Sequence, residues 1–200
     1  DKGAESVSYA AGAAHVYTME QAISNTNVLF AGTATAGVWK TLDKGQNWMS
    51  VTDTLMLGSV VALEINHQND ETVYFGGGTN IYKTYNGGSS WEIVGDATFQ
   101  VLDIWCNDLV MDPTDTNRLF AATDIGLFVT TDGGTNFSQV INGEIQEIEF
   151  HPTDPTIIYI VRQGGSQTEF YKSVDGGISF VQKTNGWPSP VSPDEQKRTE

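Results

Sequence analysis

The 200-residue sequence contains a single cysteine, so no internal disulfide can form and a cystine-stabilised fold is excluded. Cys106 lies between Ile104 and Leu109, which favours a small buried hydrophobe in a strand over a reactive thiol. No apolar run reaches the 18 residues of a membrane-spanning helix, so no membrane insertion is expected. No segment has a 3.6-residue apolar period, which argues against a helical architecture.

Positive charge is also scarce: 10 Lys and Arg stand against 25 Asp and Glu, for a formal net charge of −15. A surface this acidic repels phosphate backbones and anionic lipids, so no nucleic-acid partner is expected. A hydrophobic content of 39% with 21 glycines instead indicates a folded, turn-rich chain. The chain starts at Asp1 without a signal peptide, as a mature or trimmed fragment would.

An eight-residue motif, which we call the box, occurs four times as Ser/Thr, any residue, Asp/Asn, any residue, Gly, two residues of any type, and Trp/Phe. Its Asp or Asn recurs at spacings of 43, 46 and 43 residues. The defining residues are Thr41, Asp43, Gly45, Trp48; Thr84, Asn86, Gly88, Trp91; Thr130, Asp132, Gly134, Phe137; and Ser173, Asp175, Gly177, Phe180. Four copies at nearly constant spacing indicate a repeat architecture.

A second element, the lead-in turn, precedes each of the last three boxes by 17 to 22 residues. It is a polar turn that runs into a short β-branched and aromatic stretch, at residues 67–75, 112–120 and 151–159, with a shortened form at 25–30. Between these landmarks each repeat yields four short strands, which in the second repeat are expected at 60–65, 72–75, 81–84 and 91–94. Glu147 to Phe150 alternates with period two, as in a strand with one wet face.

Four strands in 40 to 50 residues are typical of a propeller blade. The sequence therefore predicts an all-β β-propeller of four blades, at about residues 5–53, 54–97, 98–142 and 143–183 within 1–183. Residues 184–200 are expected to begin a fifth, truncated blade. An arc of four blades exposes its edges, so the remaining blades are expected from the same or another chain.

Each position of the box has a structural explanation. Asn-Gly and Asp-Gly pairs tolerate positive φ and mark hairpin turns. The Asp or Asn side chain accepts N–H groups of its own turn, and the hydroxyl closes the same network. The glycine two places later suits a left-handed backbone, and the final aromatic packs back onto the blade. Asn86 replaces the carboxylate with an amide, which cannot act as a general base, so the boxes are predicted to be structural.

The boxes, together with the segments 37–40 and 126–128, resemble the bacterial-neuraminidase (BNR) or Asp-box repeat superfamily over residues 15 to 183. The resemblance implies a ring of six to eight blades. This superfamily includes sialidases, xyloglucan-cleaving hydrolases, sortilin-type receptors and photosystem assembly factors. In style the repeats are similar to secreted or surface proteins of Bacteroidota that end in a sorting domain of the type IX secretion system.

Two hydrolase classes of this superfamily bear on these residues. Sialidases of this superfamily use an arginine triad, whereas this chain has only Arg118, Arg162 and Arg198 and lacks the Arg-Ile/Leu-Pro motif. Residues 122–126 resemble the Thr-Asp-Ile/Val-Gly segment that carries one of two catalytic aspartates in xyloglucanase-like hydrolases, which makes Asp124 the single catalytic candidate. The alternative is that Asp124 is a bend residue between the second and third strands.

The leading hypothesis is a secreted or cell-surface, non-catalytic propeller module; the alternatives are a fragment of a xyloglucanase-like glycoside hydrolase and an intracellular assembly chaperone. A protein or glycan partner is expected at the loops 96–103 and 163–168, with Phe99, Trp105 and Trp187 as anchors, although Trp105 also suits a core position. No cofactor or metal site is predicted, apart from weak Ca²⁺ binding at the acidic turns 70–71 and 112–115.

Overall fold

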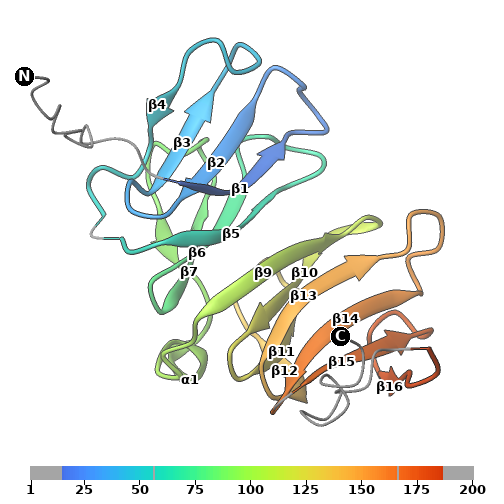
Figure 1. Cartoon of the computed structure of the whole chain (residues 1–200). Helices are drawn as coiled ribbons and strands as arrows, with labels where there is room; N and C mark the ends of the chain where they lie inside the picture. The colour runs from blue at the N-terminus through green and yellow to red at the C-terminus, as the bar shows by residue number, and fades with distance from the viewer. Residues whose placement is uncertain (1–14, 56, 166, 187–200) are drawn as a thin grey trace, which may run out of the picture.

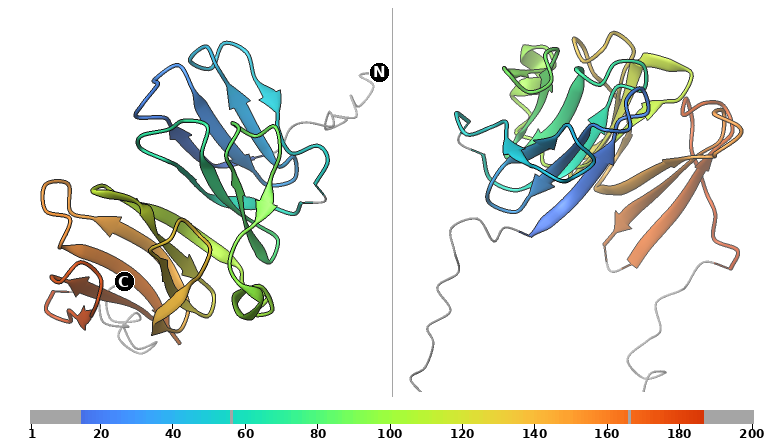
Figure 2. Two further views of the ribbon diagram at one scale, coloured as in Figure 1. Left: turned by 180° about the vertical axis from the view of Figure 1, so that it is seen from behind. Right: turned by 90° about the horizontal axis from the view of Figure 1, so that it is seen from above.

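The computed structural model describes residues 15–55, 57–165 and 167–186, and short antiparallel strands make up most of it. The strands form four separate four-stranded sheets that follow one another around an arc (Figure 1, Figure 2). The prediction of an all-β propeller with four-stranded blades is thereby confirmed. Of the expected fifth blade, residues 187–200 lie outside the described residues.

Each blade takes its four strands in chain order, so neighbours in sequence are neighbours in the sheet. Blades 1 and 2 consist of β1 (Val16–Gln21), β2 (Leu29–Thr33), β3 (Val38–Thr41), β4 (Met49–Ser50), β5 (Val60–Ile65), β6 (Val73–Gly77), β7 (Asn80–Thr84) and β8 (Glu92–Ile93). Blades 3 and 4 consist of β9 (Cys106–Asp112), β10 (Asp115–Thr123), β11 (Gly126–Thr130), β12 (Ser138–Asn142), β13 (Ile145–Phe150), β14 (Ile158–Gly164), β15 (Gln167–Ser173) and β16 (Val181–Gln182). The first strand of each blade contacts the first strand of the next, so these strands line the centre of the arc.

The box forms the corner between the third and fourth strands of each blade. In blade 2 the Thr84 hydroxyl donates to Asn86 Oδ1 at 2.8 Å and accepts the N–H of Gly88 at 3.0 Å. Asn86 Oδ1 also accepts the N–H of Ser90 at 2.9 Å. Equivalent bonds recur in the other three boxes, and the four box glycines have φ of 83–97°. The corner network and the left-handed glycine match the expectation from sequence.

The box is also joined to the lead-in turn of its own blade. The residue after the Asp or Asn donates its N–H to a carbonyl of that turn over 2.8–3.0 Å: Lys44 to Asn27, Gly87 to Glu71, Gly133 to Asn117 and Gly176 to Thr156. Because strands alternate in direction, these turns share one rim of the arc, the box rim. The turns between second and third strands and the links between blades share the opposite rim, the link rim.

Three apolar clusters, one between each pair of adjacent blades, form the core. Phe30, Tyr74 and Phe120 occupy equivalent places on the second strands, are at most 1% exposed, and lie in the clusters that join their blades to the next. The Trp91 indole packs edge-on against Phe75 and donates to a carbonyl of blade 1, that of Val51, at 2.8 Å. The box aromatic therefore contacts the preceding blade as well as its own.

The link between blades 2 and 3 contains one element that the sequence did not predict, the helical turn α1 (Ala97–Gln100). The Asp96 side chain caps it by accepting the N–H of Phe99 at 2.8 Å. The prediction that Phe99 serves as an exposed anchor is wrong, because its ring is 4% exposed and stacks on Phe137 at 4.3 Å. Cys106 is buried as predicted. Within the described ranges, no helix is long and apolar enough to cross a membrane.

Candidate functional site

Asp124 lies on the link rim of blade 3, in the bend between β10 and β11, and is exposed to solvent. Its carboxylate Oδ1 accepts the backbone N–H of Trp105 at 2.9 Å, and its own N–H donates to the Trp105 carbonyl at 3.0 Å. The Thr123 hydroxyl donates to the Gly126 carbonyl at 2.7 Å and so closes the turn from below. These three bonds hold the carboxylate of an exposed residue in a defined position.

Trp105, whose backbone bonds this carboxylate, is 39% exposed. This favours the expectation of an exposed anchor over the core alternative. Trp105 ends the link between blades 2 and 3, residues 94–105, which is longer than the other two links between blades and contains α1. Asp103 in this link has a φ of 56°, a left-handed conformation that Asp tolerates better than most residues. Trp187, the other expected anchor, lies outside the described residues.

The same turn in the other blades has no carboxylate. Strand pairing aligns Asp124 with Ala34 in blade 1, Gly78 in blade 2 and Gln163 in blade 4. Ala34 and Gln163 make the same backbone hydrogen bond to the preceding link, at 2.8 Å. The backbone of the turn is thus repeated, while the carboxylate is peculiar to blade 3.

The box carboxylates lie on the box rim and bond only within their own turns. Hydrogen bonds from the Asn47 side chain, its N–H and Thr41 hold the pKa of Asp43 at about 2. Asp132 and Asp175 also have a pKa of about 2 for the same reason. A carboxylate stabilised this strongly in its charged form is a poor proton donor or acceptor near neutral pH. The hydrogen bonds of these residues stabilise the corner, and their predicted structural role stays a prediction.

A set of acidic side chains on the inner strands was missed at the sequence level. Burial, aided by repulsion from Glu64 and Asp108, raises the pKa of Glu20 to about 7. Burial likewise raises the pKa of Asp108 to about 6, although this carboxylate accepts the N–H of Ile148 at 3.1 Å and so ties blade 3 to blade 4. Glu64 bonds His67 at 3.1 Å. Glu20 on β1 and Glu64 on β5 occupy the same register position in their blades. The recurrence of a glutamate at this position was the sequence signal that could have revealed the acidic set.

The remaining sequence candidates are engaged in local structure. In the proposed calcium turn, the Asp112 carboxylate accepts the Thr114 hydroxyl at 2.7 Å and pairs with Arg118 at 2.9 Å. Arg162 pairs with Glu169 at 3.5 Å. Arg198 lies outside the described residues. Among the residues that the structure describes, no group of three or more His, Cys, Asp or Glu is placed to hold a metal ion.

No family model matches the chain. A xyloglucanase of Hypocrea jecorina (strain QM6a) is 27% identical over an alignment of 189 positions, which covers 86% of this chain and 22% of that protein. The GH74 enzyme of Niastella koreensis superimposes with a TM-score of 0.72 at 18% identity, over 90% of this chain and 32% of that one. YCF48 bound to the D1 peptide superimposes with a TM-score of 0.60 at 16% identity, over 90% and 55%.

The solved structures establish the propeller fold and, at this identity, nothing more specific. The chain spans about a fifth of the curated xyloglucanase and about a third of the Niastella enzyme. A xyloglucanase as sequence relative favours the hydrolase alternative over the non-catalytic module preferred from the repeats alone.

Proposed function

We propose that the chain is a propeller segment of a glycoside hydrolase that cleaves a xyloglucan-type β-glucan, with Asp124 as one of its two catalytic carboxylates. The single observation that carries the proposal is an exposed carboxylate, that of Asp124, fixed by the backbone N–H of Trp105, a residue that is itself 39% exposed. Of the four described blades, only this one has a carboxylate at that turn. The sequence likeness to a xyloglucanase supports the substrate class.

The roles follow from the chemistry of glycoside hydrolysis. One carboxyl group protonates the leaving oxygen, and a second acts as base or nucleophile about 5 to 9.5 Å away. Asp124 would act as one member of this pair, with its position set by the Trp105 N–H. The exposed Trp105 indole would stack on the apolar face of a sugar ring. The second carboxylate would come from outside this chain.

Two finer assignments accompany the proposal. The four boxes are of the Asp-box type, which is supported by their shared hydrogen bonds. The protein acts outside the cell, because a polysaccharide of this size is degraded where it occurs.

The test is Asp124→Asn in the complete protein that contains this chain, with hydrolysis and binding of xyloglucan measured separately. Asparagine keeps an oxygen for the Trp105 N–H but cannot transfer a proton, so we expect kcat to fall by about 10²–10⁴-fold with binding retained. Asp132→Asn on the box rim is the matched control, since Asn86 occupies that place in blade 2. Unchanged hydrolysis by Asp124→Asn would refute the proposal. Binding without hydrolysis by the wild type would favour the non-catalytic module.

A further inference from the structure

Every blade carries a cation above the aromatic ring of its second strand. The pairs, with 4.5–5.6 Å between cation and ring centroid, are Lys40–Phe30, Lys83–Tyr74, Arg118–Phe120 and Lys172–Tyr159. The chain has only 10 Lys and Arg, so four cations that lie over equivalent rings are not general surface charge. In blade 3 the third strand offers Val129 opposite Phe120, and Arg118 of the second strand takes over the role.

In the first three blades this cation donates to the box of the following blade. Lys40 Nζ bonds the Gly87 carbonyl at 2.9 Å, and Lys83 Nζ bonds the Gly133 carbonyl at 2.7 Å. Arg118 Nη2 bonds the equivalent carbonyl of Gly176. A charged donor makes these bonds stronger than neutral ones. The three junctions thus share one arrangement: a buried aromatic between the blades, and a cation that reaches across to a box carbonyl.

Blade 4 repeats the donor half of this arrangement at the end of the arc. Lys172 lies over Tyr159, and within the described residues no box carbonyl accepts a hydrogen bond from it. Tyr159 is partly exposed, whereas its equivalents in the other blades are at most 1% exposed. It lines a shallow hollow of about 170 Å³ together with Ile160 and Val161.

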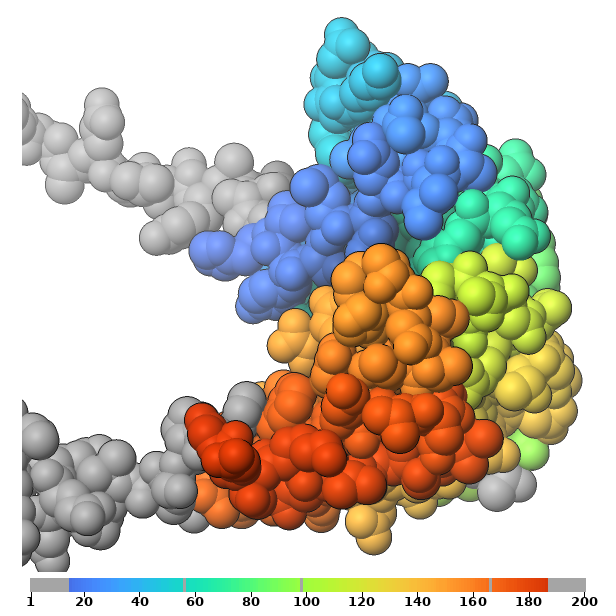
Figure 3. Space-filling view, turned by 90° about the vertical axis from the view of Figure 1, so that its right-hand side faces the viewer, coloured from blue at the N-terminus to red at the C-terminus, as the bar shows by residue number. Residues whose placement is uncertain are grey.

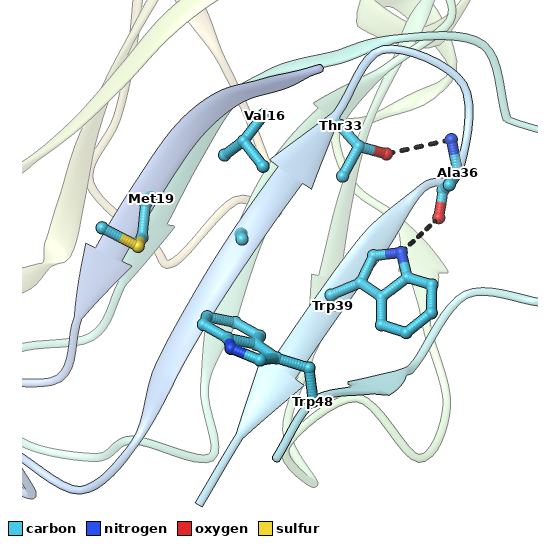
Figure 4. Close-up of a pocket in the computed structure, with 7 residues that line it drawn as sticks. Val16, Met19, Thr33, Ala36, Trp39 and Trp48 are labelled. Carbon is cyan, nitrogen blue, oxygen red and sulfur yellow. Dashed lines mark hydrogen bonds between the residues drawn. The ribbon is translucent and has the colours of Figure 1, made fainter. Parts of the chain in front are cut away.

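Blade 1 presents the acceptor half. Figure 4 shows Val16, Met19, Trp39 and Trp48 around a hollow of about 350 Å³ on the outer face of its sheet. Val16 is 60% exposed and Met19 is 58% exposed. The residues at the same register in the other blades are at most 3% exposed: Val60, Cys106 and Ile145 for Val16, and Leu63, Leu109 and Ile148 for Met19.

Within the part of the chain that the structure describes, two polar groups of blade 1, the Trp48 indole and the Lys44 carbonyl, lack the contact with a neighbouring blade that their equivalents make. The Trp48 indole donates to Gly45 in its own box at 3.1 Å, whereas the Trp91 indole donates to the preceding blade. Lys44 holds the place of the acceptor glycines and shares their left-handed backbone, with a φ of 60°. Its carbonyl accepts no hydrogen bond from a cation of the described residues. In Figure 3, blade 1 in blue and blade 4 in orange to red form the two ends of the molecule.

We propose that the two end faces are docking surfaces for further blades of this repeat, and that a cation-to-box-carbonyl hydrogen bond aligns each blade with the next. At the blade 4 face, Lys172 donates to the box carbonyl of a following blade. At the blade 1 face, the Lys44 carbonyl accepts the cation of a preceding blade, and the aromatic beneath that cation fills the hollow beside Met19. The occupants belong to the same polypeptide, because the chain spans only 22% of its sequence relative and 32% of the Niastella enzyme. The inference does not depend on catalysis.

Thiol labelling of the complete protein tests the blade 1 face. Cys106 is buried and gives a low background. We expect Met19→Cys to react with a soluble maleimide at least about 100-fold more slowly than Ile178→Cys, because a covered thiol reacts only through local opening. Ile178 is the control because it is 79% exposed at a box position that is also exposed in blades 2 and 3. Equal rates would overturn the proposal. Protection that disappears on dilution would assign the face to a second copy and overturn the choice of occupant.

The cation is tested at the blade 4 face with Val161→Cys as the reporter. We expect its labelling to be slow in the wild-type background and about 10-fold faster when Lys172→Met is added, because the junction then opens more readily. Lys183→Met, which removes an exposed cation of the same blade, is the control and should leave the rate unchanged. An unchanged rate with Lys172→Met would overturn the aligning role of the cation. None of these readouts uses hydrolysis, so their failure is distinguishable from failure of the proposed function.

Discussion

Replacing Thr84 with valine tests whether the box hydroxyl holds the corner of a blade. Thr84 is 1% exposed, and its Oγ1 accepts the N–H of Gly88 at 3.0 Å and that of Asn86 at 3.2 Å. Valine has nearly the same shape, so the change removes hydrogen bonds and little volume. A buried donor left without an acceptor costs about 1–3 kcal/mol, and the lost bond from the hydroxyl to Asn86 adds about 1 kcal/mol. We therefore expect the free energy of unfolding to fall by about 2–4 kcal/mol.

Urea titration followed by tryptophan fluorescence measures this loss as a lower midpoint at unchanged slope. For a protein of this size each kcal/mol corresponds to about 2–4 °C in Tm, so a loss near 3 kcal/mol lowers Tm by about 6–12 °C. Thr135→Val is the control, because its exposed hydroxyl donates only to the Asp132 carbonyl at 3.2 Å. A Thr84→Val loss below about 0.5 kcal/mol, the range of ordinary surface changes, would show that another group replaces the hydroxyl and that the reasoning is wrong.

Three further outcomes are expected. Trp105→Ala should weaken binding of the glycan by about 10-fold in calorimetry, since an aromatic contact contributes about 0.5–1.5 kcal/mol beyond its buried area, whereas Trp105→Tyr should retain most of it. Gly88→Ala should cost about 1–3 kcal/mol by urea titration, because its φ is 92° and the new Cβ would lie 2.8 Å from Cβ of Val51, while Gly78→Ala meets open space and should cost about 1 kcal/mol. Burial raises the pKa of Glu20 to about 7, and the resulting contribution to folding stability is fully present below pH 4.5 and is lost as the pH rises through 7. Tm should therefore fall from about pH 5 to pH 8, and Glu20→Gln should flatten that slope.

The repeat made the blades predictable because each corner is local in sequence. The strand expected at 60–65 is β5, and the alternation in 147–150 corresponds to a strand with exposed glutamates. The last strand of blade 2 is shorter than expected, since only Glu92 and Ile93 pair. The corner needs no information from other blades, because its hydrogen bonds join residues two to four positions apart.

The contacts between blades could not be predicted in the same way. Phe99 lies in a link without a strand pattern, and its burial depends on the Asp96 cap and on stacking against Phe137, 38 positions away. The link between Asp124 and Trp105 spans 19 positions and involves a backbone N–H, which no side-chain pattern reveals. For the same reason the motif resemblance indicated Asp124 as the catalytic candidate but did not predict its hydrogen bond to Trp105.

The box rim and the link rim are held together by different groups. On the box rim the hydroxyl and the Asp or Asn side chain make the corner, so those side chains cannot change without loss of the turn. On the link rim the threonine hydroxyl closes the turn in blades 1 and 3, but the bond to the preceding link is made by backbone groups. These are Ala34 N–H to His15 and Asp124 N–H to Trp105, so the side chain at that one position is free to differ. Freedom to differ lets one blade acquire a carboxylate and an indole without disturbing the sheet below. Asp124, the catalytic residue of our proposal, accordingly lies on the link rim, where the repeat constrains the backbone and leaves the side chain at that position free to vary.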